Sequence, residues 1–293
     1  MSGTSWEPVC PGVVTGRFTD PSEFLRALDS SSAPWEDTAD AWIFRGHADA
    51  SWDLAPKAHR PEPWRELAGP GERFFLPTAA REQVRLTAEE NLMRAFRVAL
   101  DTSGIQVPFD YNMPGNVNGL SNDKLLALAQ HYGLPTRLLD WTRQAPIAAY
   151  FACLRPRDPA PDLAVWALNA AFVREQISDG SCQIIQTTRF DNPNLHAQDG
   201  LFTLATLPTG TGLDHTEMPT IDEILSRKAS ATGHPIIRKF VLAREHDQTL
   251  MRRLHQRRVT AGRLLPGIAG AALTVRARAI PVWSQGSALL VAA

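Results

Sequence analysis

Residues 128–152, LAQHYGLPTRLLDWTRQAPIAAYFA, constrain the fold more than any other part of the chain. Leucine, tryptophan and alanine dominate this stretch, and such a composition is typical of a hydrophobic core. Side chains that carry charge or share protons interrupt it: His131, Thr136, Arg137, Asp140 and Tyr150. Because a buried charge costs free energy unless it has a partner, any fold of this chain must bring partners to these groups.

Two helices are expected within and beside this block. Ser121 is a suitable cap for a helix whose apolar residues recur at helical spacing until Gly133 ends it, which places His131 in the last turn. At that position the helix dipole stabilises a charged imidazole, so His131 suits either ligand binding and proton transfer or simple capping of the helix. A second helix is expected to begin at Asp140 or Thr142 and to run to about Leu154.

The rest of the chain alternates irregularly between strand and helix patterns. Helices are expected at 20–29, 80–100 and 248–259, and strands at 41–46, 163–169, 200–206 and 239–243. This order predicts an α+β fold with a mixed or split antiparallel sheet and flanking helices rather than a doubly wound sheet. We expect residues 1–20 to be a loose lead-in and residues 21–293 to form a single domain. Gly, Pro and Asn indicate loop insertions near 61–80 and 101–120, the second a candidate mobile flap.

Charge is distributed unevenly along the chain. The formal net charge is only −1, which does not point to nucleic acid or a membrane surface. Residues 226–278, however, hold 12 Lys and Arg against 2 Asp and Glu. Within that basic segment, Arg252, Arg253, Arg257 and Arg258 could track a phosphate backbone, although a solvated helix face is the commoner explanation of such a pattern.

Location and several kinds of chemistry can also be judged from the sequence. The cysteines at 10, 153 and 182 show no paired spacing, which favours a reducing compartment. No run approaches the roughly 18 apolar residues of a membrane span, so we expect a cytoplasmic protein of bacterial type with no membrane partner. No phosphate-binding loop, nucleophile elbow or spacing of metal ligands is present, so no metal is predicted.

Two charged clusters are candidates for a binding site. Arg45 and Gly46 close an apolar strand, where the guanidinium can hold a phosphate or carboxylate and the glycine lets a ligand approach the backbone. The alternative is an arginine paired with a buried aspartate. Either Arg137 or Arg45 can form an internal ion pair with Asp140. Tyr150 lies in an alanine-rich helix typical of a core, and its hydroxyl needs a partner there.

These motifs together resemble the FRG domain family. Its aromatic-Arg-Gly motif stands here as Phe44-Arg45-Gly46, followed by Trp52, Leu54 and Pro56, then by Glu89 and Phe96. The family's most distinctive block corresponds to AQHYGLPTRLLDWT, and HAQDGLFTL is similar to its later Gln-x-Gly-x-Phe motif. The resemblance spans about residues 41–275. Where the family often has Asn-Pro after its Trp-Thr pair, this chain has Gln144-Ala145-Pro146.

The pattern also has a distant likeness to ADP-ribosyltransferases, which implies an NAD-binding split sheet. On that likeness Arg45 contacts the phosphates or ribose of NAD, and the backbone at Gly46 approaches the nicotinamide amide. The pocket would be shaped by Thr136, Arg137, Tyr150 and His131. Gln198 stands where such enzymes often carry a glutamate, and glutamine cannot act as a base. The likeness therefore implies that Glu89 or Asp140 supplies the carboxylate.

Three functions remain open from the sequence. The first is an NAD-dependent, ADP-ribosyltransferase-like enzyme that modifies a nucleic acid or protein, as a toxin or phage-defence effector. The second is a nucleotide- or nucleic-acid-binding module without turnover. The third is an RNA-cleaving toxin in which His131 carries the proton.

Overall fold

A computed structural model of the chain describes residues 5–29, 35, 41–60, 78–104, 123–154, 161–187, 192–206, 219–229, 234–268 and 270–275. Side chains of the long helix are described from residue 87 onward. The expected insertions near 61–80 and 101–120, including the candidate flap, lie almost entirely outside these residues.

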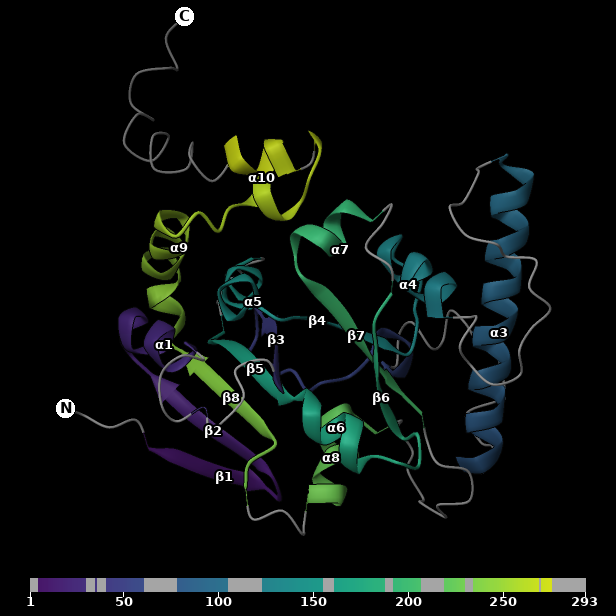
Figure 1. The fold of residues 1–293 in the computed structure, drawn as a ribbon, viewed down its shortest axis with the longest axis horizontal. Coiled ribbons are helices and arrows are strands. Elements are labelled where there is room, and N and C mark those ends of the chain that lie inside the picture. Colours follow the sequence, from purple (N-terminus) through teal and green to yellow (C-terminus); the bar gives the residue numbers. More distant parts are fainter. Residues whose placement is uncertain are drawn as a thin grey trace, which may run out of the picture.

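Within the described residues, one sheet of eight strands organises the molecule (Figure 1). The spatial order is β1-β2-β8-β5-β3-β4-β7-β6. The strands are β1 (Trp6–Cys10), β2 (Val13–Phe18), β3 (Trp42–His47), β4 (Leu138–Thr142), β5 (Leu163–Asn169), β6 (Cys182–Ile185), β7 (Gly200–Ala205) and β8 (Ile237–Leu242). The strands β2 and β8 pair in parallel, whereas the other pairs are antiparallel. Of the predicted mixed or split antiparallel sheet in an α+β fold, the structure shows a mixed, mostly antiparallel sheet with helices.

The sheet opens in its middle, between β3 and β4. On one side β3 pairs with β5 from Trp42 through His47. On the other side, β3 and β4 are in register only where Phe44 faces Thr142. Beyond that pair the two strands diverge, so the backbone groups that would join them need other partners.

Helices cover both faces of the sheet. They are α1 (Pro21–Ala27), α3 (Thr78–Thr102), α4 (Asp123–His131), α5 (Ala145–Ala152), α6 (Ala170–Gln176), α7 (Pro193–Ala197), α8 (Ile221–Ala229), α9 (Asp247–Gln256) and α10 (Ala261–Leu264), with short 3-10 turns at Lys57–His59 and Arg244–His246. Successive strand residues face opposite sides. Accordingly Phe44 packs in the cluster with α1, α5 and α9, whereas Ile43 packs in the cluster with α6 and α8.

Several expected elements are confirmed with small shifts at their ends. The side chain of Asp20 accepts hydrogen bonds from the backbone of Ser22 and Glu23, so it caps α1 as predicted. The expected strand at 163–169 is β5, residue for residue. The strands expected at 200–206 and 239–243 correspond to β7 and β8, and the helices expected at 80–100 and 248–259 correspond to α3 and α9.

Other expectations are wrong. Residues 6–18 form β1 and β2 instead of a loose lead-in, because β2 pairs with β8, more than 220 residues further along the chain. Asp140 does not begin a helix: it lies inside β4, and α5 begins at Ala145. The strand β3 does not end at Arg45-Gly46 but continues to His47, so Arg45 projects from within a strand.

Candidate active site in the opened sheet

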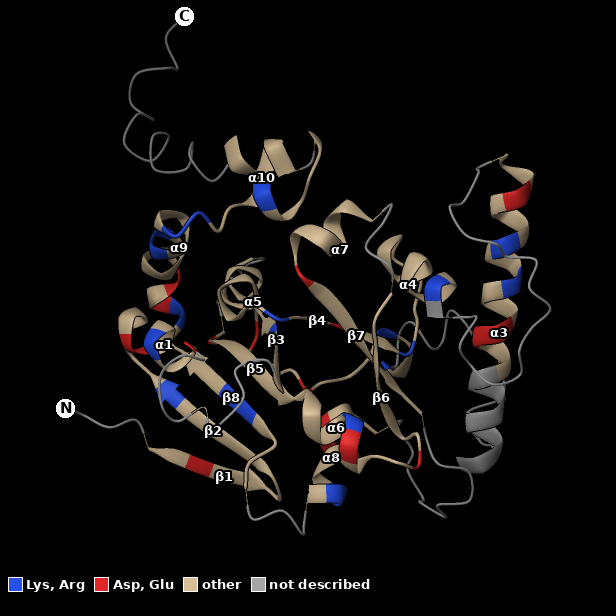
Figure 2. Cartoon of the chain, viewed as in Figure 1, with Lys and Arg blue, Asp and Glu red and all other residues tan. Residues whose placement is uncertain are grey.

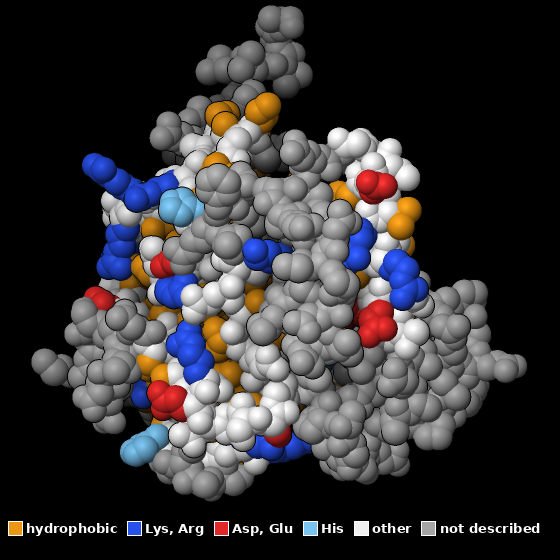
Figure 3. All heavy atoms as spheres, turned by 45° about the vertical axis from the view of Figure 1, so that its right-hand side comes forward, with side chains coloured by type: hydrophobic (Ala, Val, Ile, Leu, Met, Phe, Trp, Pro, Cys, Tyr) orange, Lys and Arg blue, Asp and Glu red, His pale blue; other side chains and the backbone are white. Residues whose placement is uncertain are grey.

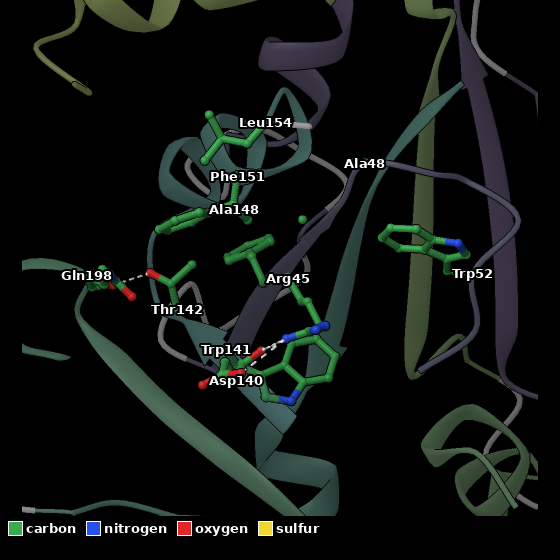
Figure 4. A pocket seen from close by; sticks show the side chains of 12 residues that line it. Arg45, Ala48, Trp52, Asp140, Trp141, Thr142, Ala148, Phe151, Leu154 and Gln198 are labelled. Atoms are coloured by element: carbon green, nitrogen blue, oxygen red, sulfur yellow. Dashed lines mark hydrogen bonds and ion pairs between the residues drawn. The ribbon is translucent and has the colours of Figure 1, made fainter. Parts of the chain in front are cut away.

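A cavity of about 440 Å³ lies where β3 and β4 separate (Figure 4). Its walls come from β3, β4, α5, the residues after β3 and the end of α7. The residues that line it are Phe44, Arg45, Gly46, Ala48, Trp52, Asp140, Trp141, Thr142, Ala148, Phe151, Leu154 and Gln198. Of the predicted site residues, the fold brings Arg45, Gly46, Asp140 and Gln198 together in this cavity.

The guanidinium of Arg45 bridges the opening between the two strands. Its Nη1 donates to the backbone carbonyl of Asp140 at 2.8 Å, in place of the strand-to-strand hydrogen bond that the divergence removes. The same nitrogen lies 3.7 Å from the Asp140 carboxylate. Burial lowers the pKa of Arg45 from its ordinary value, with the Asp140 charge acting in the opposite direction. Arg45 therefore presents a partly desolvated charge at the cavity.

A buried histidine holds this guanidinium from the other side. Arg45 Nε donates to Nε2 of His47 at 2.9 Å. An arginine can only donate, so Nε2 of the neutral imidazole is the acceptor of this bond. Nδ1 lies between the carbonyl of Trp52, at 3.2 Å, and the indole nitrogen of Trp166, which donates to it at 3.1 Å. Burial, and then the Arg45 charge, hold the pKa of His47 well below its usual value. The imidazole thus remains a neutral acceptor that fixes the direction of the Arg45 side chain.

The carboxylate of Asp140 lies at the open edge of the cavity. Its side chain is 60% exposed, which makes it available to a ligand. Gln130 Nε2 donates to Asp140 Oδ2 at 2.7 Å, and the amide oxygen of Gln130 in turn accepts from the Thr136 hydroxyl. Thr136 is fully buried behind this relay rather than in the cavity lining. It therefore contributes to the site by orienting Gln130.

One wall of the cavity is apolar and comes largely from α5, through Ala148, Phe151 and Leu154. Gly46 sets the approach of this helix to β3. A Cβ at Gly46 would stand 1.9 Å from the carbonyl oxygen of Ala148, so only glycine permits the contact. The close neighbour of Gly46 is therefore helix α5. Trp52, which is 36% exposed, stands at the opposite side of the cavity.

Gln198 connects the cavity to the C-terminal part of the chain. The backbone carbonyl of Gln198 accepts from the Thr142 hydroxyl at 2.6 Å. Its side-chain Nε2 donates to the carbonyl of Leu264, in α10, at 3.1 Å. The amide of Gln198 thus ties the cavity wall to α10.

Arg137 and Glu89 form a separate ion pair outside the cavity lining. Arg137 donates to the Glu89 carboxylate from its backbone nitrogen at 2.9 Å and from Nε at 2.5 Å. The Arg137 Nη1 also lies 3.3 Å from the hydroxyl of Thr206. The carboxylate of Glu89 is 7% exposed. Between the two sequence alternatives for Asp140, the structure therefore chooses Arg45 as its partner.

Tyr150 and His131 also lie outside the cavity lining. Tyr150 is buried in the core beside α9, with its ring centroid 6.4 Å from that of His255, and burial raises the pKa of its hydroxyl. His131 is exposed at the end of α4, with its Nε2 3.5 Å from the amide nitrogen of Asn194. Neither side chain is among those that surround the Arg45 guanidinium.

Sequence reasoning missed His47, Trp52 and Gln130. His47 had a recognisable signal, since it stands two residues after Arg45 and a strand places such residues on one face. Trp52 belongs to the motif of Trp52, Leu54 and Pro56, but nothing in that motif indicates that the Trp52 side chain is exposed at a cavity. Gln130 stands next to His131 in the sequence, and no motif singles it out. It becomes a partner of Asp140 only because α4 packs beside β4.

Two properties hold for the described residues as a whole. None of the helices there is both long and apolar enough to span a bilayer. No cluster of three or more His, Cys, Asp or Glu side chains in the same residues has a geometry suited to a metal ion.

Comparison with known proteins gives one match. Residues 40–160 match the family model described as the FRG domain, a stretch that contains β3, β4, α5, Arg45 and Asp140. The later motif around Gln198 lies outside the matched residues. No curated protein and no solved structure matches the chain. Over residues 40–160, which hold the bridging arginine and the opening of the sheet, the chain is therefore similar to the FRG domain.

Proposed function

We propose that the cavity between β3 and β4 binds NAD and that the protein is an ADP-ribosyltransferase-like enzyme acting on a nucleic acid or protein. The observation that carries this proposal is the Arg45 guanidinium, held across the opened sheet beside an exposed carboxylate and an apolar wall. A cytoplasmic role as a toxin or phage-defence effector is part of the same proposal.

Arg45 is the proposed ligand of the NAD phosphates. A guanidinium offers five donors in a planar fork, and two of its nitrogens are already oriented by His47 and by the Asp140 carbonyl. Such pre-orientation reduces the entropy lost on binding. Burial of the guanidinium strengthens its attraction to an anion relative to that of an exposed charge.

The apolar wall suits the nicotinamide ring. Phe44, Ala148 and Phe151 offer hydrophobic surface on the side of α5, and Trp52 offers a second aromatic surface. Aromatic faces attract a cationic ring such as the pyridinium of NAD. A volume of about 440 Å³ is within the range of small-molecule pockets and accommodates part of a dinucleotide.

Asp140 is the proposed carboxylate of the reaction. Glu89 is committed to Arg137 outside the cavity, which leaves Asp140 as the acidic side chain in the lining. The bond between ribose C1′ and nicotinamide nitrogen breaks with its electron pair moving to nicotinamide, and the acceptor attacks C1′ and loses a proton. Asp140 would orient a ribose hydroxyl and stabilise the oxocarbenium-like charge.

One observation favours the second function, binding without turnover. The Asp140 carboxylate is already bonded to Gln130 and lies close to Arg45, so its charge is partly compensated. A compensated carboxylate stabilises a developing cation less strongly. Nucleotide binding at the same cavity requires no such charge.

The experiment is to incubate the full chain with NAD and to measure NAD affinity by calorimetry and nicotinamide release by chromatography. Arg45→Lys keeps the charge but loses the planar fork, and it should weaken NAD binding by at least about tenfold. Arg174→Gln, at an exposed arginine on α6, is the matched control and should bind NAD like the wild type.

Each result has a definite meaning. Binding with nicotinamide release that depends on Arg45 supports the enzyme. Binding without release supports the module, and an absence of NAD binding by the wild-type chain refutes the proposal. Thermal melting of each variant distinguishes loss of the site from loss of the fold.

A further inference from the structure

We propose that exposed arginines at the end of α9 and on α10 form a docking surface for nucleic acid, which serves as the acceptor of the reaction. This arginine rim consists of Arg252, Arg257, Arg258 and Arg263. Its role as an acceptor surface rests on the proposed function, whereas its affinity for nucleic acid does not.

The charge of the rim is not compensated by neighbouring acids. All four side chains are exposed, and among the described residues none forms an ion pair with an Asp or Glu. The sequence contains no Asp or Glu after Asp247. Elsewhere, by contrast, Arg17, Arg143 and Lys228 each have an acidic partner within 4.0 Å. The rim therefore keeps its full positive charge toward solvent.

The backbone that carries the rim is fixed to the core. Leu250 and Leu254 of α9 are fully buried, and Ala261 and Leu264 of α10 are almost fully buried. Backbone hydrogen bonds continue past the helix, from Arg257 to the Arg253 carbonyl and from Arg258 to that of His255. Arg258 has a φ of 61°, a left-handed conformation that glycine adopts at lower cost. The chain therefore has an arginine at this position in spite of the backbone strain.

The rim continues into the wall of the cavity. The chain from α9 to α10 passes α5, where Cys153 Sγ lies 3.9 Å from the Asp247 carbonyl and Tyr150 faces His255. It then reaches Leu264, whose carbonyl accepts from Gln198, a residue of the cavity lining. Figure 2 shows blue at the end of α9, along the following loop and on α10, above α5. A polymer on the rim would lie beside the mouth of the cavity.

The chemistry of the rim fits nucleic acid better than other anionic partners. A lipid surface binds helices through an exposed apolar face, but the apolar face of α9 is already buried against the core. A chain of phosphates supplies repeated fixed anions that match a row of permanently charged guanidinium groups. In the space-filling view, Lys and Arg side chains project from the upper left edge of the molecule (Figure 3).

The test uses the full chain and a fluorescein-labelled single-stranded RNA of mixed sequence, with a DNA of the same sequence as second probe. Anisotropy titrations give the affinity at several salt concentrations without NAD. The rim variant combines three substitutions, Arg252→Gln, Arg257→Gln and Arg258→Gln. It should weaken binding by at least about tenfold and reduce the slope of log affinity against log salt concentration by about 2–3. The matched control replaces three exposed arginines elsewhere, Arg94, Arg97 and Arg174, by glutamine.

The outcomes separate this inference from the proposed function. Loss of affinity in the rim variant alone, with NAD binding retained, supports the docking surface. A triple lysine variant of the rim should restore most of the affinity, because it keeps the charge. Equal losses in rim and control variants, unchanged affinity in the rim variant, or no binding by the wild type would each overturn the inference. Failure of NAD binding with intact RNA binding would refute the proposed function alone.

Discussion

Two arginine–carboxylate pairs, one across the opening of the sheet and one between α3 and the start of β4, differ in how they are built. Arg137 and Glu89 approach to 2.5 Å, and the carboxylate is 7% exposed. Arg45 and Asp140 are 3.7 Å apart, and that carboxylate is 60% exposed. Glu89 also accepts from the backbone of Arg137, whereas Asp140 accepts from the side chain of Gln130.

The difference indicates that one pair stabilises the fold and that the other is available to a ligand. A buried pair whose lone pairs are satisfied is expensive to break, because either partner alone is a desolvated charge. A wider pair with an exposed carboxylate contributes little to stability, and a ligand can compete for its groups. Arg137–Glu89 therefore fastens α3 to the start of β4, and Arg45–Asp140 leaves charge available at the cavity.

The largest effect is expected from breaking the buried pair. Glu89→Gln should lower the free energy of unfolding by about 3–5 kcal/mol, because it leaves the Arg137 charge without compensation. Urea denaturation measures the change. Glu90→Gln, at the exposed neighbouring position, should change stability by less than about 0.5 kcal/mol. Equal effects of the two substitutions would contradict the distinction between the pairs.

An intermediate effect is expected from the histidine that holds Arg45. Because the pKa of His47 lies well below its unfolded value near 6.5, only the unfolded chain takes up this proton as the pH falls below 6.5. The wild type should lose up to about 2 kcal/mol of stability between pH 6.5 and 5 through this group.

His47→Gln should remove that part of the pH dependence, as measured by denaturation at several pH values. His196→Gln, at an exposed histidine, should keep it. A His47 variant with the same pH profile as the wild type would show that folding does not lower the pKa of this imidazole.

The smallest effect on stability is expected at Asp140. Asp140→Asn would cost several kcal/mol only if the pair were buried, and the exposed carboxylate does not meet that condition. We expect a change below about 1 kcal/mol by denaturation, together with reduced nicotinamide release from NAD. A loss of stability as large as that of Glu89→Gln would make the two pairs equivalent.

Local sequence signals predicted much of the secondary structure. Asp20 before Pro21 identified the start of α1, because an N-cap acts within its own turn. The continuous apolar run of residues 163–169 identified the strand β5, which the structure shows to be buried on both faces. The segment that became β4 was misread as the start of a helix, because five residues with leucine, tryptophan and threonine do not establish a period.

The candidate site was predictable only in part. The sequence indicated Arg45 and Asp140 as candidates, since charges among apolar residues need partners. It could not decide between Arg45 and Arg137 as the partner of Asp140. The strand spacing of Arg45 and His47 was a signal for His47, but the sequence offered no reason to select Gln130. The choice of Arg45 depends on the meeting of β3 and β4, because Arg45 and Asp140 are 95 residues apart in the chain.

By itself, then, the sequence determined the kinds of element, the polar groups that require partners and the resemblance that the family match supports. Only the tertiary structure decided that β3 and β4 separate after a single pair and that Arg45 spans the opening. The physical reason is that helix caps and apolar periods act over a few residues. The pairing of charges, in contrast, depends on the positions that the whole packed sheet gives to distant strands.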